Sequence, residues 1–228
     1  MKLVIFDVDG TLVDSQDVIV EAQRRAFRAQ GLAPPTRERS LSIVGLSLRE
    51  AFLVLAGEEA PTDALVESYK LAFQGLRLDP RYDPPVFPGA LATLSRLARR
   101  GDVKLAIATG KSRRGVAHFI ERHRLEGLFA SIQTADDAPS KPHPGMIMQA
   151  MAETGIGPRD VAMIGDTTYD MAMAAAARAR GIGVAWGYHA QEALRAAGAA
   201  TVLARFRDLD GALDAAFAAP VAPAPEEA

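Results

Sequence analysis

The stretch Leu3-Val-Ile-Phe-Asp-Val-Asp-Gly-Thr-Leu-Val13 decides the fold of this chain. Its first four residues predict a buried strand, because parallel strands covered on both faces are continuously apolar rather than alternating. The run ends in Asp7 and Asp9, followed by the turn-forming Gly10. In open α/β sheets, ligands bind outside the carboxyl ends of the strands. The two carboxylates therefore indicate a ligand site, although a polar turn explains an isolated D-x-D-G pattern equally well.

Similar apolar runs recur along the chain and alternate with segments whose apolar residues have helical spacing. This alternation predicts an α/β fold, a doubly wound parallel sheet with a Rossmann-like core. The predicted strands are Leu3–Phe6, Val103–Ala108, Ala130–Gln133, Val161–Ile164, Gly181–Ala185 and Ala200–Leu203.

The region from residue 16 to residue 83 departs from this alternation. It contains no convincing strand, and prolines and glycines separate its helical stretches. Those stretches are Val18–Gln30, Leu48–Ala56 and Asp63–Leu76. We therefore expect an all-helical module at residues 16–83, inserted into a core made of residues 1–15 and 84–218. The proline-rich tail at residues 219–228 is expected to be disordered.

A second acidic cluster follows another predicted strand, in Val161-Ala-Met-Ile-Gly-Asp-Thr-Thr-Tyr-Asp170. Helix capping alone would explain Asp166. Both acidic clusters, however, follow strands of one parallel sheet and should meet at the same edge. Oxygen ligands without cysteine or clustered histidine select a hard cation, most simply Mg²⁺. The expected metal ligands are Asp7, Asp9, Asp166 and Asp170.

A third motif, Ala108-Thr-Gly-Lys-Ser112, follows the second core strand. It resembles the end of the phosphate loop G-x-x-x-x-G-K-[ST], but Leu105 stands where that loop needs a glycine, so we reject a P-loop. A hydroxyl, a glycine amide and a helix N-terminus remain, which together suit an anion. The alternative is simple helix capping by Thr109 or Ser112.

A fourth motif, Ser140-Lys-Pro-His-Pro144, places a lysine between residues that stiffen the backbone. Lys141 is therefore presented with little freedom, and it could neutralise a phosphate and offset the acidic clusters. Most single lysines are solvated surface residues, and the rigid setting is what distinguishes this one.

The composition limits the kinds of molecule that the protein is expected to bind. The formal net charge of −2 provides no basic field for nucleic acid or anionic lipid. The absence of cysteine excludes disulfides and thiolate catalysis. The apolar run at the N-terminus is too short for a signal peptide, and none is long enough for a membrane span. We therefore expect a cytoplasmic protein that binds neither nucleic acid nor membrane; whether it is a monomer or a homodimer is open.

The four motifs in this order resemble those of the haloacid dehalogenase-like hydrolase superfamily, and the helical insertion is similar to the phosphoglycolate phosphatase-like branch. The resemblance extends from residue 1 to about residue 215. It implies a Mg²⁺-dependent phosphatase of small phosphorylated metabolites, phosphoglycolate being the family's default suggestion. The helical module at residues 16–83 would be a cap that closes over the site.

The resemblance also implies roles for individual residues. Asp7 would be the nucleophile that forms an aspartyl-phosphate, and Asp9 the general acid and base, with its backbone carbonyl on the metal. Lys141 would balance the phosphoryl charge that Thr109 helps to hold. Asp166 would bind the metal, and Asp170 would bind or support it. The expected substrate-binding residues are Thr11, Gly110, Gly45 and Arg49.

Two alternatives stay open at this point. A phosphomutase would share the aspartyl-phosphate but exclude water, and a catalytically silent phosphate-binding protein would share the fold. Gly181-Ile-Gly-Val-Ala-Trp-Gly187 lacks the dinucleotide spacing and is interpreted as a strand with its exit turn. Trp186 is interpreted as a packing residue.

Overall fold

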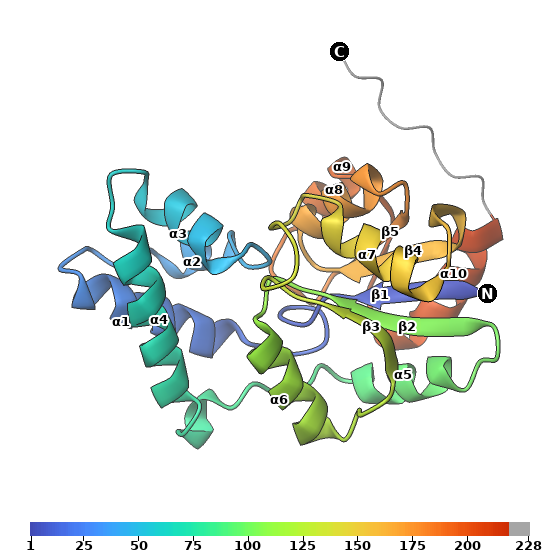
Figure 1. The fold of residues 1–228 in the computed structure, drawn as a ribbon, viewed down its shortest axis with the longest axis horizontal. Helices are drawn as coiled ribbons and strands as arrows, with labels where there is room; N and C mark the ends of the chain where they lie inside the picture. The colour runs from blue at the N-terminus through green and yellow to red at the C-terminus, as the bar shows by residue number, and fades with distance from the viewer. Residues whose placement is uncertain (219–228) are drawn as a thin grey trace, which may run out of the picture.

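The chain folds around a six-stranded parallel sheet with the strand order β3-β2-β1-β4-β5-β6. Figure 1 shows this computed structural model, which describes residues 1–218. The strands are β1 (Lys2–Phe6), β2 (Val103–Ala108), β3 (Phe129–Gln133), β4 (Val161–Gly165), β5 (Arg180–Val184) and β6 (Ala199–Leu203). The predicted doubly wound parallel sheet is confirmed, and each strand end lies within one residue of its prediction.

The strand β1 lies in the middle of the sheet, between β2 and β4. Phe6 pairs with Ile107 on one side and with Ile164 on the other. The chain places β2 and β3 on one side of β1, and β4, β5 and β6 on the other. The strand order therefore reverses between β1 and β4, and their carboxyl ends border this topological switch point. This is the place at which open α/β sheets bind ligands.

Helices cover both faces of the sheet, because successive side chains of a buried strand point to opposite faces. Val4 and Phe6 belong to one hydrophobic cluster, which contains α5, α6 and α10; Leu3 and Ile5 belong to the other, which contains α7 and α8. These elements and their neighbours are α5 (Ala90–Ala98), α6 (Arg113–His123), α7 (Gly145–Thr154), η2 (Pro158–Asp160), α8 (Thr168–Ala176), α9 (Gln191–Ala196), η3 (Phe206–Asp208) and α10 (Leu209–Ala218).

The segment between β1 and α5 is helical and lies beyond the carboxyl ends of the strands, as Figure 1 shows. Its helices share a hydrophobic cluster of their own, in which Phe27, Phe52 and Tyr69 make ring contacts. The elements are α1 (Gln16–Ala29), α2 (Arg37–Leu41), α3 (Leu48–Ala56), α4 (Thr62–Leu76) and η1 (Pro80–Tyr82). The short α2 was not predicted. We refer to this segment as the proposed cap.

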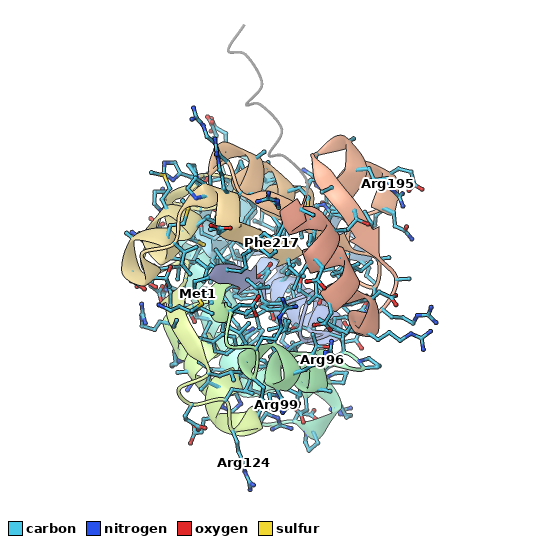
Figure 2. The ribbon with its side chains drawn as sticks, turned by 90° about the vertical axis from the view of Figure 1, so that its right-hand side faces the viewer. Met1, Arg96, Arg99, Arg124, Arg195 and Phe217 are labelled. Atoms are coloured by element: carbon cyan, nitrogen blue, oxygen red, sulfur yellow. The ribbon has the colours of Figure 1, made fainter. Side chains whose placement is uncertain are left out.

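The opposite end of the sheet carries the start of the chain and the last described helix (Figure 2). There the Lys2 side-chain nitrogen lies 4.7 Å from the ring centroid of Phe217. Figure 2 also shows Arg124 and Arg195 at the rim of this end. Across residues 1–218, none of the helices is both long and apolar enough to cross a bilayer. The tail predicted to be disordered lies outside the described residues.

Candidate active site

Three aspartates from two strand ends meet at the switch point. Asp7 directly follows β1, Asp166 directly follows β4, and Asp170 lies in the first turn of α8. One carboxylate oxygen from each lies within 4.8 Å of the other two, and all three residues are buried. The parallel pairing of β1 with β4 brings these residues together, although they are far apart in the sequence.

Lys141 lies among these carboxylates. Its Nζ is 2.9 Å from Oδ2 of Asp7 and 2.6 Å from Oδ1 of Asp170, and its side chain is fully buried. Burial lowers the pKa of a lysine, but the charges of Asp170 and Asp7 outweigh it and raise the pKa of Lys141 above its ordinary value. Lys141 is therefore a cation, one positive charge beside three carboxylates.

The acidic group retains more negative charge than Lys141 can neutralise. Burial raises the pKa of Asp7 to about 6, and the charge of Lys141 only partly opposes this. Burial, followed by the charges of Asp170 and Asp7, raises the pKa of Asp166 well above its ordinary value. A divalent cation would remove this surplus, and hard oxygen donors suit Mg²⁺. The residues present therefore fit a magnesium ion.

Hydrogen bonds hold two of the aspartates in place, Asp170 through the cap of its own helix and Asp166 through distant segments. The Thr167 hydroxyl accepts the backbone N–H of Asp170 at 3.2 Å, and Asp170 Oδ2 accepts the backbone N–H of Thr167 at 3.1 Å, which forms a capping box. Asp166 accepts hydrogen bonds from the Thr11 hydroxyl and the Tyr188 backbone N–H, each at 2.9 Å. Thr167 rather than Asp166 caps α8, and the hydroxyl of Thr11 is engaged with Asp166.

The side chain of Asp9 points away from the three aspartates. Its Oδ1 lies 2.8 Å from Nζ of Lys111 and also accepts a short hydrogen bond from the Ser15 hydroxyl. The Asp9 carboxylate is not part of the compact acidic group. A metal contact from Asp9 would therefore come from its backbone carbonyl, which is the contact that the family resemblance implies.

Thr109 and Gly110 follow β2 on the other side of β1. Thr109 is buried, and its hydroxyl interacts with the carboxylate of Asp7. A Cβ atom on Gly110 would lie 2.5 Å from the carbonyl oxygen of Gly45, so only glycine leaves room for the loop of the proposed cap. Ser112 caps α6 by accepting the Gly115 backbone N–H at 3.3 Å. Helix capping therefore explains Ser112 but not Thr109.

The two residues predicted from the proposed cap lie in different places. Gly45 lines a small cavity together with Asp7 and Thr109. Arg49 lies on the surface, with a side chain 59% exposed, and pairs with Asp63. The predicted contact between Arg49 and a leaving group stays a prediction.

That small cavity, of about 110 Å³, lies between the proposed cap and the core, and we call it the inner cavity. Its core side is formed by Asp7, Asp9, Thr109, Gly110 and Lys111. Its cap side is mostly apolar and includes Ile19, Val44, Leu48, Phe52, Tyr69 and Phe73. The inner cavity can therefore shield a group bound at Asp7 from water.

Hydrogen bonds join the proposed cap to the core above this cavity. The Ser47 backbone N–H donates to the Ser140 hydroxyl at 2.8 Å, one residue before Lys141. The Tyr169 hydroxyl donates to the carbonyl of Ser42 at 3.2 Å. The cap loop is therefore tied to the two core segments that carry Lys141 and Asp170.

Sequence reasoning missed two supports of the site. The pairing of Lys111 with Asp9 was not foreseen, because nothing local relates two residues so far apart. The turn after β5 was interpreted only as a strand exit, yet a Cβ atom on Gly187 would lie 2.1 Å from the Cβ of Asp166. The glycine at position 187 was the only sequence feature that could have indicated this close approach to Asp166. Trp186 does pack, against Phe87 and Phe206.

Comparisons with known proteins agree with this geometry. A family model described as "Haloacid dehalogenase-like hydrolase" matches residues 4–184. A Dickeya dadantii protein named "Probable phosphatase IndB" is 37% identical over 217 residues, which cover 93% of this chain and 94% of that protein. A "Phosphoglycolate phosphatase" of Yersinia pestis is 31% identical over 211 residues, 90% of each chain.

A solved structure supports the fold in the same way. The crystal structure described as a hydrolase from Pseudomonas syringae superposes with a TM-score of 0.83 at 28% identity. The match covers 94% of this chain and 99% of that chain. The similarity therefore includes the proposed cap as well as the sheet.

Proposed function

The chain belongs to the haloacid dehalogenase-like hydrolase family and is a phosphatase of that family, and we propose that it hydrolyses small phosphomonoesters through a phosphoryl group carried on Asp7, with Mg²⁺ as cofactor. The observation that carries this proposal is the position of Asp7. It lies at the switch point, between the Lys141 ammonium, two further buried aspartates and Thr109, at the floor of the inner cavity.

The first step forms a covalent intermediate. The Asp7 carboxylate attacks phosphorus, the bond from phosphorus to the ester oxygen breaks, and Asp9 gives its proton to the departing oxygen. Lys141 and Thr109 stabilise the phosphoryl oxygens as charge builds on them. Mg²⁺, when bound, supplies positive charge that offsets the repulsion between the carboxylate and the phosphate dianion.

The second step restores the enzyme. Asp9, now a carboxylate, takes a proton from a water molecule, whose oxygen attacks the phosphorus of the aspartyl-phosphate. Phosphate leaves, and Asp7 returns to its free form. One acid thus acts twice, which requires it to lie within reach of both the departing oxygen and the water, and Asp9 lines the same cavity as Asp7.

The proposed cap excludes bulk water while the phosphoryl group is transferred. The loop at Gly45 lies against Gly110, and Ser47 bonds to Ser140, so the cap side of the inner cavity is held over Asp7. Exclusion of water strengthens the electrostatic contacts of Lys141 with the substrate. We also propose that the enzyme is cytoplasmic and acts on a small phosphorylated metabolite, with phosphoglycolate as the first compound to test.

Phosphate release from p-nitrophenyl phosphate and from a panel of sugar and acid phosphates tests this function. We expect Mg²⁺-dependent turnover, and loss of about 10³-fold or more in Asp7→Asn, because the amide is not a nucleophile. Asp17→Asn, an exposed aspartate of α1, is the matched control and should retain full activity. Wild-type turnover by Asp7→Asn would refute the assigned nucleophile. Phosphoryl transfer between sugar hydroxyls without phosphate release would indicate a phosphomutase, and no turnover at all a silent binding protein.

A further inference from the structure

A second cavity adjoins the inner cavity on the side of α6. It lies between the end of α4, the linker at residues 78–84 and α6, and has a volume of about 260 Å³, against about 110 Å³ for the inner cavity. We call it the outer cavity. The residues that line both cavities are Asp9, Phe73, Lys111 and Gly115. The two cavities therefore meet at the proposed general acid.

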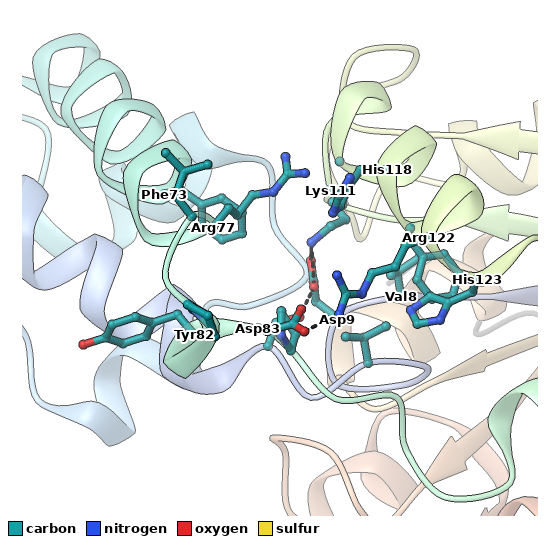
Figure 3. A pocket seen from close by; sticks show the side chains of 17 residues that line it. Val8, Asp9, Phe73, Arg77, Tyr82, Asp83, Lys111, His118, Arg122 and His123 are labelled. Atoms are coloured by element: carbon teal, nitrogen blue, oxygen red, sulfur yellow. Dashed lines mark hydrogen bonds and ion pairs between the residues drawn. The ribbon is translucent and has the colours of Figure 1, made fainter.

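The outer cavity combines aromatic rings with charged groups. Phe73, Tyr82 and Phe119 are among its lining residues. Each of its two acids already has a cationic partner in its wall: Asp9 pairs with Lys111 and Asp83 pairs with Arg122, as the dashed lines of Figure 3 show.

Arg77 also lines the outer cavity, and neither of these two ion pairs includes it. It is half-buried at the end of α4, and within residues 1–218 its guanidinium has neither an ion-pair partner nor a hydrogen-bond acceptor. Figure 3 shows it extending toward Lys111 and His118 on the opposite wall. Burial, together with the charges of Arg77 and Arg122, lowers the pKa of His118. An oxyanion in the outer cavity would relieve this excess of positive charge.

The position of Asp9 determines where a leaving group can extend. The departing oxygen must come within hydrogen-bond reach of the general acid, and the phosphoryl group lies beside Asp7 in the inner cavity. We propose that the leaving group extends past Asp9 into the outer cavity, and that it has an apolar body ending in an oxyanion, a carboxylate or a second phosphate, bound by Arg77. This inference rests on the proposed function and specifies its substrate class.

The cap side of the inner cavity is the competing direction, and it offers no comparable partner. The charged residues that line the inner cavity are Asp7, Asp9 and Lys111, all from the core. The cap side adds the polar side chains of Gln23 and Tyr69 but no cation, so an anionic group there would lose its hydration without an opposite charge to replace it. A leaving group as small as glycolate would also leave most of the outer cavity unfilled. Size and charge therefore both favour a larger anionic leaving group in the outer cavity.

Three esters with one aromatic body test the proposal: phenyl phosphate, 4-carboxyphenyl phosphate and 1,4-phenylene bisphosphate. We expect wild-type kcat/KM to be roughly tenfold or more higher for at least one anionic ester than for phenyl phosphate, since a charge-assisted contact is involved. Whichever of the two anionic esters has the higher kcat/KM shows whether the outer cavity prefers a carboxylate or a phosphate. Arg77→Gln should abolish most of this preference. Arg114→Gln, an exposed arginine of α6 that lines neither cavity, is the matched control and should retain it.

Equal kcat/KM values for the three esters in the wild type, or an unchanged preference in Arg77→Gln, would overturn the inference while phenyl phosphate turnover upheld the phosphatase. If none of the three esters were hydrolysed, the proposed function would fail instead. Calorimetric binding of the same esters to the wild type and to Arg77→Gln would then decide the inference by itself: tighter binding of an anionic ester that Arg77→Gln loses supports it, and equal binding refutes it.

Discussion

The side-chain nitrogen of Lys141 lies 2.9 Å from the Asp7 carboxylate, and both groups are buried. The proposed nucleophile is therefore held by a cation before any substrate arrives. This contact links the stability of the protein to its chemistry, because the charge that would balance a phosphoryl group also balances the buried carboxylates of Asp7 and Asp170.

Replacing Lys141 by Met should destabilise the protein by about 3–5 kcal/mol, since removal of one partner leaves buried carboxylates without their counter-charge. Urea unfolding of the metal-free protein measures this free energy. Lys70→Met is the matched control, because Lys70 forms an exposed pair with Glu67 and should change stability by about 0.5 kcal/mol or less. Equal unfolding midpoints for the two variants would contradict the buried ion pair.

The stability of the metal-free protein should depend on the raised pKa of Asp7. Because the folded-state pKa is about 6 and the ordinary value is 3.8, this group contributes stability below pH 3.8 that is lost as pH rises through 6. Asp7→Asn should therefore be more stable than the wild type at pH 7.5 but not at pH 3.8. The difference between their unfolding free energies, measured against pH, cancels the contributions of the groups that do not interact with Asp7. A difference that does not change with pH would refute the raised pKa.

Magnesium should restore the stability that the metal-free protein loses as pH rises. At pH 7.5 a concentration of about 100 times Kd should raise the Tm of the wild type by roughly 5–10 °C, because the ion binds the folded state and offsets the buried carboxylates. At pH 4 the same addition should have little effect, since protonated carboxyls do not bind the ion. Differential scanning calorimetry with a chelator as the reference measures both shifts. Equal Tm shifts at the two pH values would argue against binding at this site.

Gly187→Ala should weaken magnesium binding by about tenfold or more, because its new Cβ would lie 2.1 Å from the Cβ of Asp166 and would displace that side chain. The magnesium concentration that gives half-maximal phosphatase activity measures the effect. Gly211→Ala in α10 is the matched control, because its Cβ would meet no atom within 4 Å. An unchanged magnesium dependence in Gly187→Ala would show that Asp166 is not held as described.

Gly110→Ala should disturb the proposed cap, because the added Cβ would lie 2.5 Å from the carbonyl oxygen of Gly45. We expect faster hydrogen exchange across residues 43–47 and a fall of about tenfold or more in kcat/KM, since the cap no longer seals the inner cavity. Gly157→Ala, whose Cβ would meet no atom within 4 Å, provides the comparison. Exchange rates in the loop that matched those of Gly157→Ala would mean that the close approach is not needed for docking.

Much of the site could be predicted because its parts are local. A short apolar run predicts a buried strand wherever it occurs, and a carboxylate directly after such a strand lies at the ligand-binding edge of a parallel sheet. Asp7 and Asp166 satisfy both conditions. Their meeting required only that the two strands be neighbours, as β1 and β4 are. The proposed cap was predicted in outline for a similar reason, since helical spacing without strands is visible in one segment.

The sequence by itself thus determined where the apolar strands lie along the chain and which acidic residues follow them, because each of these depends on neighbours within a few positions. Only the tertiary structure decided that Asp9 turns to Lys111, that Thr11 supports Asp166, and that Arg77 has no carboxylate partner among residues 1–218. Those outcomes depend on which side chains from distant segments come within about 3 Å of one another, and that is settled by packing between elements rather than by any local pattern.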